Sequence, residues 1–200
     1  MTSLERVVLA SSNTGKLAEF NQLLAGLGIE FVSQASLGVD DADETGRSFV
    51  ENALIKARHA STVTGLPALA DDSGICVDAL DGAPGLYAAR YAGVHGDEAA
   101  NRAKLLRELE GKAANERGAY FIAVIVLLRH ADDPAPIIVE GRWSGRILTA
   151  ARGDGGFGYD PLFLPDGFEQ SAAELDPARK NSLSHRGLAV AALRDRLGAR

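Results

Sequence analysis

The sequence contains very little cysteine and no long apolar run, and each absence excludes a class of protein. Cys76 is the single cysteine of the 200-residue chain, which excludes an internal disulfide or a zinc site built from several thiolates. A reducing compartment is the default for such a chain. No segment approaches the ~18 apolar residues of a membrane-spanning helix, and Met1–Ser12 lacks the pattern of a secretion signal. We therefore expect a soluble cytoplasmic protein that binds no membrane.

Basic residues are too scattered to form a surface for nucleic acid. The chain has 21 Lys and Arg residues against 27 Asp and Glu residues, a net charge of -6, and no basic block. Binding to duplex nucleic acid depends on many contacts between cations and phosphates, so we expect no such partner. A small anion held by a few local cations is still allowed. Hydrophobic residues make up 46% of the chain, which is ordinary for a globular protein. The length of 200 residues predicts a single domain over residues 1–200, with a layout of two lobes as the alternative.

Two adjacent carboxylates and a hydroxyl stand between two apolar runs in the middle of the chain. The stretch Ala68–Val77 contains Asp71, Asp72 and Ser73 directly after its first apolar residues. We predict that a buried strand ends here, because polar side chains at strand ends of an α/β sheet face a cleft. Paired aspartates there can hold Mg2+, which prefers oxygen ligands. The alternative is a plain turn, which this stretch alone favours, since Asp, Ser and Gly are common turn residues.

A polar segment near the amino terminus is a candidate phosphate-binding turn. The apolar run Val7–Ala10 predicts a strand, Ser11–Lys16 is polar, and apolar residues then recur at helical spacing. The start of a helix exposes unpaired N–H groups at the positive end of its dipole, which suits a phosphate. The alternative is that Asn13 or Thr14 only caps the helix and that Lys16 faces solvent.

An acidic loop precedes a second predicted helix. The loop Gly38–Gly46 contains Asp43 and Glu44, which either contribute a carboxylate to a site or are merely solvated. Ser48 followed by Glu51 three residues later is the capping-box pattern of a helix start. We therefore predict that the acidic loop leads directly into the amino terminus of a helix.

Three apolar segments in the second half of the chain predict a mixed sheet. Ala119–Leu128 is the longest apolar run and is rich in aromatic and β-branched residues, which predicts a strand buried on both faces. Ile137–Val139 and Trp143–Leu148 predict two shorter antiparallel strands separated by three other residues. With the strand, turn and helix near the amino terminus, they indicate an α/β fold with a mixed central sheet and flanking helices.

A glycine-rich loop follows these strands. In Gly153–Pro161, four glycines fall within six positions and alternate with Phe157 and Tyr159. A flexible linker would contain few aromatic residues. We expect a shaped loop whose backbone approaches a ligand closely and whose rings stack on it.

Two polar segments near the carboxyl terminus accompany predicted helices. Asp176 and Pro177 predict the N-cap and the first residue of a short helix that ends near Lys180. His185 and Arg186 stand at the start of the final predicted helix, where by themselves they indicate an ordinary surface end.

Six ordered motifs together resemble one known family. They are S-x-N-x-x-K from Ser11, S-F-x-E-N-A-x-x-K-A, A-D-D-S-G, A-P-G-x-Y-A-A-R, F-G-Y-D-P and K-x-x-x-S-H-R from Lys180. In this order, over almost the whole chain, they resemble the inosine triphosphate pyrophosphatase family. The resemblance implies a mixed α/β fold with two lobes around a cleft, and a homodimer. It also implies magnesium-dependent hydrolysis of ITP, dITP or XTP to the monophosphate and pyrophosphate.

The same resemblance implies roles for residues of this chain. Asp72 would be the acidic catalytic residue and a ligand of Mg2+. Asp43 or Glu44 would be the second metal ligand, and both stay open because relatives often have two glutamates here. The residues that would contact the nucleoside triphosphate are Ser11, Ser12, Asn13, Thr14, Gly15, Lys16, Ser73, Phe157, Gly158, Tyr159, Asp160, Lys180, His185 and Arg186.

The charge and the base of such a substrate indicate the chemistry. A triphosphate repels an incoming nucleophile, so Lys16, Lys180 and Arg186 would supply positive charge beside a carboxylate-bound metal. Hypoxanthine and xanthine have a 6-oxo acceptor where adenine has an amino donor, which a donor such as Arg186 would distinguish. Two alternatives are a nucleotide sensor without catalysis and a metal-dependent phosphatase of another small phosphate ester. The fold alone would not separate these functions.

Overall fold

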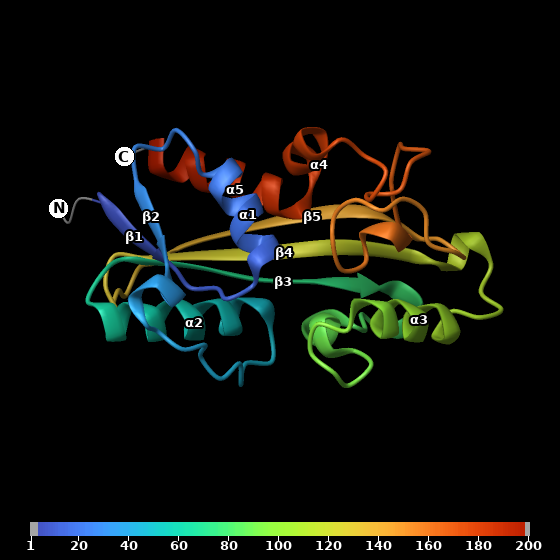
Figure 1. Cartoon of the computed structure of the whole chain (residues 1–200), viewed down its shortest axis with the longest axis horizontal. Coiled ribbons are helices and arrows are strands. Elements are labelled where there is room, and N and C mark those ends of the chain that lie inside the picture. Colours follow the sequence, from blue (N-terminus) through green and yellow to red (C-terminus); the bar gives the residue numbers. More distant parts are fainter. Residues whose placement is uncertain (1–3, 199–200) are drawn as a thin grey trace. The chain divides into compact units, whose positions relative to one another are not determined.

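The structure, a computed structural model, describes residues 4–198 (Figure 1). In chain order its main elements are β1 (Arg6–Leu9), α1 (Thr14–Leu23), β2 (Glu30–Ser33), α2 (Phe49–Thr64), β3 (Ala68–Val77), α3 (Glu98–Glu108), β4 (Gly118–Leu128), β5 (Ile137–Ile147), β6 (Phe163–Pro165), α4 (Pro177–Leu183) and α5 (His185–Gly198). Short 3-10 turns, such as Gly85–Arg90, connect some of them.

The six strands form one mixed sheet in the order β2-β1-β3-β4-β5-β6. β1 pairs in parallel with β2 and β3, whereas β5 and β6 are antiparallel. The predicted α/β fold with a mixed central sheet is therefore confirmed. The register aligns Leu9, the last residue of β1, with Leu69 of β3. Residues of β3 after Leu69 therefore extend past the carboxyl end of β1.

Contacts divide the chain into two compact units. Unit 1 contains Met1–Asp72, Ala123–Gly141 and Gly187–Arg200, and unit 2 contains Ser73–Ile122 and Arg142–Arg186. The strands β3, β4 and β5 each contribute residues to both units. Two units agree with the two lobes that the resemblance implies. A single functional domain over residues 1–200 stays a prediction, and its ends, residues 1–3 and 199–200, lie outside the described part of the chain.

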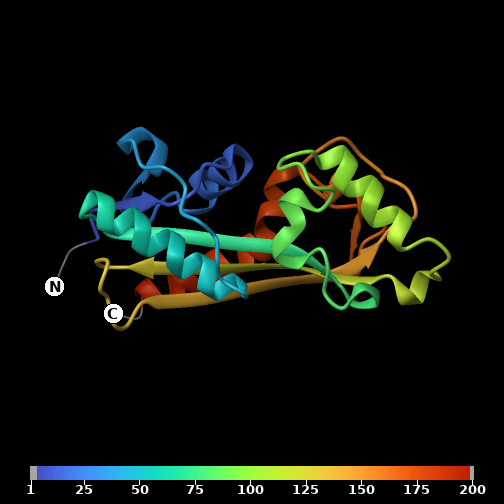
Figure 2. The same ribbon diagram turned by 90° about the horizontal axis from the view of Figure 1, so that it is seen from below.

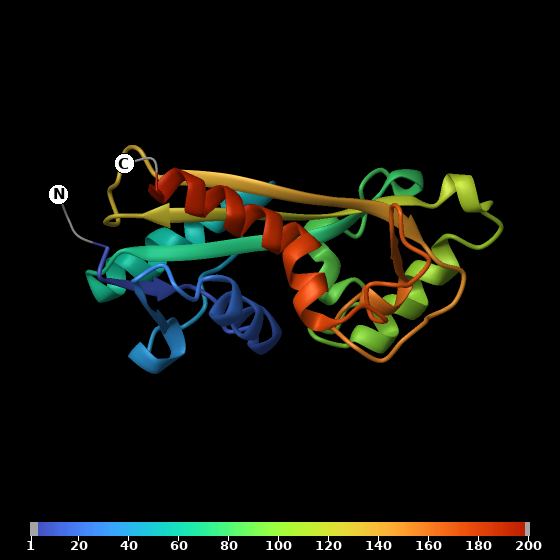
Figure 3. The ribbon, with the colours of Figure 1, turned by 90° about the horizontal axis from the view of Figure 1, so that it is seen from above.

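Unit 1 has helices on both faces of its part of the sheet. Figure 2 shows α2 against one face, and Figure 3 shows α1 and α5 over the other. Phe20 of α1 and Leu193 of α5 belong to one buried cluster with Leu69 of β3. Burial of each such side chain stabilises the fold by about 1.5–3 kcal/mol. On the other face, α2 buries a stripe of alanines at helical spacing.

Unit 2 has an apolar cluster of its own. Leu105 of α3, Trp143 of β5 and Phe163 of β6 belong to it. The ring of Phe121 meets that of Phe163 edge-on, with ring centroids 4.8 Å apart and an interplanar angle of 72°. This is one of the favoured geometries of aromatic pairs. Each unit therefore has its own buried apolar core.

The structure corrects the prediction for the acidic stretch. β3 runs without interruption from Ala68 to Val77, so no strand ends at Asp71, and the alternative of a plain turn is also wrong. The strand continues through two buried carboxylates because both have ammonium partners, which removes most of the cost of burying them. The strand that does end at this level is its neighbour β1. The acidic pair of β3 therefore lies just past the carboxyl end of the neighbouring strand β1.

β5 is likewise one strand where two were predicted. It runs from Ile137 to Ile147 through the residues that the prediction placed between two strands. Its burial alternates along most of its length, so Glu140 and Arg142 point to the exposed face. Such alternation is the ordinary pattern of a single strand with one covered face, and these polar residues therefore do not interrupt it.

Other local predictions are confirmed. β4 is buried along most of its length. Ser48 caps α2, and its hydroxyl oxygen accepts the main-chain N–H of Glu51 at 3.4 Å. Asp176 caps α4, but this helix continues to Leu183, past the end predicted near Lys180, because the backbone first becomes extended at Ser184.

The structure also describes the single cysteine and the apolar character of the helices. Cys76 is a buried free cysteine. Between residues 4 and 198, no helix is both long enough and apolar enough to cross a membrane.

Candidate active site

The turn between β1 and α1 holds a lysine against a buried aspartate. Asn13 is the N-cap of α1, and its side-chain oxygen accepts the main-chain N–H of Lys16 at 2.9 Å. The Ser11 hydroxyl oxygen accepts the Asn13 N–H at 3.2 Å. The Lys16 Nζ lies 2.8 Å from Asp71 Oδ2. The alternative that Asn13 caps the helix is therefore confirmed, but its second part, that Lys16 faces solvent, is wrong.

The same turn presents main-chain donors. The N–H groups of Thr14 and Gly15 lie in the first turn of α1, where a helix provides no acceptor for them. The Ser12 hydroxyl donates its only proton to Asp41 Oδ2 at 2.6 Å, and Asp41 also accepts a hydrogen bond from Gln34. In this arrangement the turn can hold an anion through N–H groups and the dipole of α1 rather than through the Ser12 hydroxyl.

Asp72 lies in a second group of charged side chains in unit 1. Its Oδ1 lies 2.8 Å from Lys56 Nζ, which also lies 2.9 Å from Glu44 Oε1. Its Oδ2 accepts a hydrogen bond from Asn52 Nδ2 at 3.3 Å. We call the two neighbouring groups together the Asp72 cluster: Lys16, Glu44, Lys56, Asp71 and Asp72.

Sequence reasoning did not select Lys56 or Asn52 as site residues. Both lie on α2, four positions apart, so they share one face of the helix. Asn52 is buried next to the alanine stripe of that helix, where an uncharged polar side chain needs a partner. The available signal in the sequence is this pair of polar residues at helical spacing beside an apolar stripe.

Burial and charge act in opposite directions on the groups around Asp72. Burial raises the pKa of Asp72, and although the ammonium groups of Lys56 and Lys16 oppose the change, the pKa stays above its usual value. For Lys56, burial lowers the pKa, but attraction to Asp72 and Glu44 outweighs it and raises the pKa overall. Lys56 is therefore charged at neutral pH, and Asp72 binds a proton more readily than an ordinary aspartate.

Glu44 and Asp72 are the carboxylates that fit a metal ion. Their oxygens meet at one cationic group, because Lys56 Nζ contacts both Glu44 Oε1 and Asp72 Oδ1. Protein sites for Mg2+ on nucleotides typically use one or two carboxylates, with phosphates and water as the other ligands. In the described chain, no three His, Cys, Asp or Glu side chains are grouped so that they would enclose a metal. The pair therefore fits an ion that takes further ligands from a substrate.

His185 and Arg186 are buried in unit 2, so their interpretation as a surface end is wrong. The Arg186 Nη2 donates a hydrogen bond to the Ser73 hydroxyl oxygen at 3.0 Å. The His185 ring stacks on Phe121, with centroids 4.8 Å apart and an interplanar angle of 12°. Ser73 is the only residue of β3 that is partly exposed, and it directly follows Asp72 in the chain. We call these four side chains the Arg186 cluster: Ser73, Phe121, His185 and Arg186.

Asp160 holds the glycine-rich loop in shape. Its Oδ2 accepts the Phe157 N–H at 2.9 Å and lies 2.7 Å from Lys180 Nζ. The same Nζ lies 5.1 Å from the centroid of the Phe157 ring. Arg102 donates a hydrogen bond to the main-chain oxygen of Gly158 at 2.6 Å. These contacts bring Lys180 of α4 together with three other predicted substrate-binding residues, Phe157, Gly158 and Asp160 of the loop.

One expectation for this loop is corrected. The Tyr159 ring belongs to the buried core of unit 2 and its hydroxyl donates to the Ala88 oxygen at 2.9 Å, so the ring does not face outward for stacking. Phe157 is the ring of the loop that is partly exposed. A Cβ at Gly156 would clash with Asp160 Oδ2, so this glycine makes room for the loop's own carboxylate.

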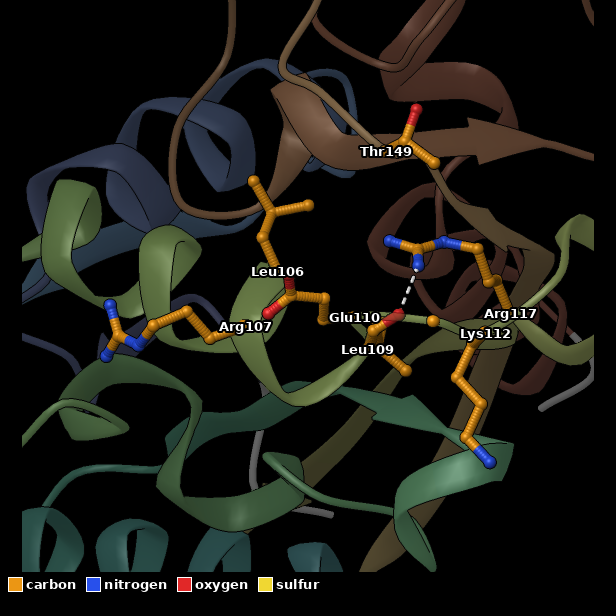
Figure 4. Close-up of a pocket in the computed structure, with 8 residues that line it drawn as sticks. Leu106, Arg107, Leu109, Glu110, Lys112, Arg117 and Thr149 are labelled. Carbon is orange, nitrogen blue, oxygen red and sulfur yellow. Dashed lines mark hydrogen bonds between the residues drawn. The ribbon is translucent and has the colours of Figure 1, made fainter.

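A cavity of about 420 Å3 in unit 2 contains none of the predicted site residues. It is lined by the end of α3, by Arg117 and by Thr149 (Figure 4). The buried Arg117 donates hydrogen bonds to the main-chain oxygens of Leu109, Ile147 and Leu148 at 2.7, 2.8 and 2.9 Å. These bonds join the end of α3 to the end of β5, so we interpret Arg117 as a structural residue.

Comparison with known sequences agrees with this arrangement of motifs. Residues 7–196 match the model of the Ham1 family. A dITP/XTP pyrophosphatase of Xanthomonas oryzae pv. oryzae is 61% identical over 196 residues, which cover 98% of each chain. A dITP/XTP pyrophosphatase of Ralstonia nicotianae is 58% identical over 197 residues, 97% of each chain.

Solved structures give the same result. A HAM1 protein from Coxiella burnetii superimposes with a TM-score of 0.91 at 49% identity, covering 98% of this chain and 99% of that one. A nucleoside-triphosphatase, or dITP/XTP pyrophosphatase, from Mycobacterium abscessus does so with a TM-score of 0.77 at 46% identity, covering 94% of this chain and 98% of that one. The family resemblance predicted from the six motifs is thereby confirmed, and the chain belongs to the Ham1 family.

Proposed function

We propose that this protein is a nucleoside-triphosphate pyrophosphatase that hydrolyses dITP, ITP and XTP to the monophosphate and pyrophosphate. The observation that carries the proposal is the Asp72 cluster, in which lysines and carboxylates gather beside the amino terminus of α1. Relatives 61% and 58% identical to this chain are named dITP/XTP pyrophosphatase. The reaction would remove non-canonical purine nucleotides from the cellular pool.

The turn before α1 would bind the triphosphate. Lys16 has its ammonium fixed by Asp71, and the N–H groups of Thr14 and Gly15 point out of the first helical turn. Together with the dipole of α1 they would attract phosphate oxygens. Ser11, Ser12 and Asn13 would support this role mainly by holding the turn, since their side-chain oxygens accept or donate bonds within it or to Asp41.

Glu44 and Asp72 would hold Mg2+, and we propose Glu44 rather than Asp43 as the second ligand, because the Glu44 carboxylate shares Lys56 with that of Asp72. Mg2+ bound there would neutralise phosphate charge and lower the pKa of a water molecule. The chain's own contribution is to orient the Asp72 carboxylate, whose Oδ2 accepts a hydrogen bond from Asn52 Nδ2.

Asp72 would orient the attacking water and accept its proton. Attack of the water oxygen on the α-phosphorus would form a new P–O bond in the monophosphate. The bond from the α-phosphorus to the oxygen that bridges to the β-phosphorus would break, so pyrophosphate would leave with that oxygen in one step. The positive charge of Lys16 would stabilise the negative charge on the leaving group.

The Arg186 cluster and the glycine-rich loop would bind the nucleoside. Phe157 has the partly exposed ring of the loop and would stack on the purine. Arg186 would donate a hydrogen bond to the 6-oxo group, whereas adenine would leave that donor unpaired. Further contacts to the nucleoside would come from the neighbours of Arg186, which are Ser73 and His185, and from those of Phe157, which are Gly158 and Lys180. Tyr159 and Asp160 would act by shaping the loop.

We also propose that the protein is a cytoplasmic homodimer that does not bind nucleic acid. The dimer is what the motif resemblance implies for the chain. Light scattering during gel filtration would then give twice the monomer mass of 21.0 kDa. A mass of one chain at micromolar concentration would contradict the dimer without affecting the proposed reaction.

A panel of nucleoside triphosphates, assayed with and without Mg2+, tests the proposed reaction. We expect dITP, ITP and XTP to give the monophosphate and pyrophosphate, with much slower turnover of dATP and no turnover without a divalent ion. Release of orthophosphate would instead indicate a phosphatase. Binding of nucleotides without any product would indicate a sensor.

Hydrolysis in 18O-labelled water tests the site of attack. Attack on the α-phosphorus places the label in the monophosphate. Label in the pyrophosphate would show attack on the β-phosphorus and would contradict the proposed mechanism while leaving the substrate class intact.

A further inference from the structure

Lys56 lies where the two proposed metal ligands meet. Its Nζ is 2.9 Å from Glu44 Oε1 and 2.8 Å from Asp72 Oδ1, and 13% of its side chain is exposed. Glu44 comes from the acidic loop and Asp72 from β3, so the lysine of α2 joins two separate segments. A divalent ion bound by both carboxylates would lie between them, in the place that the ammonium fills. The ammonium and the ion therefore compete for one position.

The charge of the Asp72 cluster supports such competition. Its two lysines and three carboxylates leave one net negative charge. Adding a divalent ion without moving either lysine would make the cluster positive and would place Lys56 directly against the ion. Repulsion between close charges is strong where water is scarce. An ion can therefore bind tightly here only if the Lys56 ammonium moves or if further negative charge arrives.

A triphosphate supplies that further charge, and the side chain of Lys56 can move to meet it. The ammonium stands on a flexible four-carbon stem, so it can leave the carboxylates while α2 stays in place. Phosphate oxygens bound to the same ion would then be acceptors for it. With the triphosphate present, the ion and both lysines can coexist without a large net charge.

We propose that Lys56 is an internal counter-ion that fills the metal position in the nucleotide-free protein and leaves it when a divalent ion arrives with the triphosphate. The inference rests on the proposed metal site at Glu44 and Asp72. It follows that the free protein binds a divalent ion alone only weakly. Lys56 thereby links metal binding to nucleotide binding.

Calorimetric titration of the nucleotide-free, full-length protein with MnCl2 tests the inference. Lys56→Met keeps the length of the side chain and removes its charge, so we expect Mn2+ to bind about tenfold more tightly or better than to the wild type. Lys56→Arg keeps the charge and should show no gain. Arg58 is exposed on the same helix, and Arg58→Met is a matched loss of one positive charge that should leave Mn2+ affinity unchanged.

Equal or weaker Mn2+ binding by Lys56→Met would overturn the inference. So would a gain that persists when Asp72→Asn is added, since the ion would then bind elsewhere. Lys56→Gln provides a second test if Lys56→Met does not fold. Melting temperature is an independent readout, because Mn2+ should raise it more in Lys56→Met than in the wild type. Pyrophosphate release from dITP by the wild type is measured separately. If the wild type releases pyrophosphate but Lys56→Met does not bind Mn2+ more tightly, only the counter-ion inference is refuted. If Lys56→Met binds Mn2+ more tightly but the wild type releases no pyrophosphate, only the proposed function is refuted.

Discussion

Asp72 combines two features that oppose each other in a stable fold. It is a carboxylate inside a strand, only 7% exposed, and burial raises its pKa in spite of two nearby lysines. An isolated buried charge is costly, so the fold keeps Asn52 and Lys56 against this one. A residue whose ionised form is held at some cost to stability is more typical of a functional site than of a structural ion pair.

Replacement of Asp72 by asparagine should make the protein more stable at neutral pH. Because the folded state raises the pKa of Asp72, the unfolded chain releases this proton first as the pH rises above about 4. Ionisation of Asp72 therefore lowers the free energy of unfolding above that pH, and asparagine does not ionise. Urea unfolding of Asp72→Asn should show higher stability than the wild type at pH 7, with a difference that shrinks toward pH 4. A variant less stable than the wild type at pH 7 would contradict this.

Single residues could be predicted where a motif contains the chemistry itself. Asp72 and Lys16 were selected from the sequence, and the structure gives both buried or nearly buried ionic partners within unit 1. Lys56 was missed, although it stands in one of the quoted motifs, because a lysine on a helix usually reaches solvent. Its role depends on the loop containing Glu44 folding back to α2, and spacing along the chain does not encode that contact.

At the scale of elements, the loop Gly153–Pro161 shows how glycine serves the chain's own packing. Gly156 has a φ of +70° and leaves no room for a Cβ beside Asp160 Oδ2. The same carboxylate binds Lys180 and the Phe157 N–H, so the glycine and the carboxylate together position the partly exposed ring. The sequence indicated a shaped loop correctly, but not that Asp160 rather than a ligand requires the glycine.

Gly156→Ala should destabilise the protein and weaken substrate binding together. The positive φ alone costs a non-glycine residue about 1 kcal/mol, and displacement of Asp160 adds to it. Gly167→Ala is the matched control, because that glycine has a φ of +80° and nothing within 4 Å of its added Cβ. We expect Gly156→Ala to lose about 1–2 kcal/mol more than the control in urea unfolding and to raise KM for dITP. Equal effects of the two variants on stability and KM would contradict this role of Asp160.

Strand boundaries were the least predictable elements. Polar residues within β3 and β5 indicate strand ends in the sequence, yet both strands continue through them. In β3 the reason is tertiary, since Lys16 and Lys56 come from other elements to neutralise the aspartates. In β5 polar residues recur at every second position from Glu140 to Arg146, and this alternation would have predicted one strand. Helix starts at Ser48 and Asp176 were predictable because capping is local.

At the scale of the whole molecule, each unit contributes a different kind of chemistry. Unit 1 contains the charged Asp72 cluster, and unit 2 contains the Arg186 cluster and the aromatic loop. The order of six motifs along the chain predicted the family, although no single motif would have done so. Composition predicted one globular domain but not the division into two units, because each unit is assembled from segments that are distant in the sequence.

Selectivity among purines should depend on the unit that contains Arg186. We expect kcat/KM for dITP to exceed that for dATP by at least about 100-fold, since a buried donor left unpaired by the 6-amino group is costly. Arg186→Lys, which removes the planar pair of donors, should reduce this ratio while Mn2+ binding at the Asp72 cluster stays unchanged. An unaltered ratio would mean that another group recognises position 6 of the purine.

Pyrophosphate release from dITP by Asp72→Asn tests the central claim most directly, with Asp132→Asn, an exposed aspartate on a loop, as the control. The assay contains Mg2+, and dITP affinity is measured alongside. If Asp72 orients the water and accepts its proton, turnover falls by about 10²–10⁴-fold while dITP affinity changes little, and the control keeps wild-type turnover. Turnover by Asp72→Asn close to that of the wild type would contradict the account.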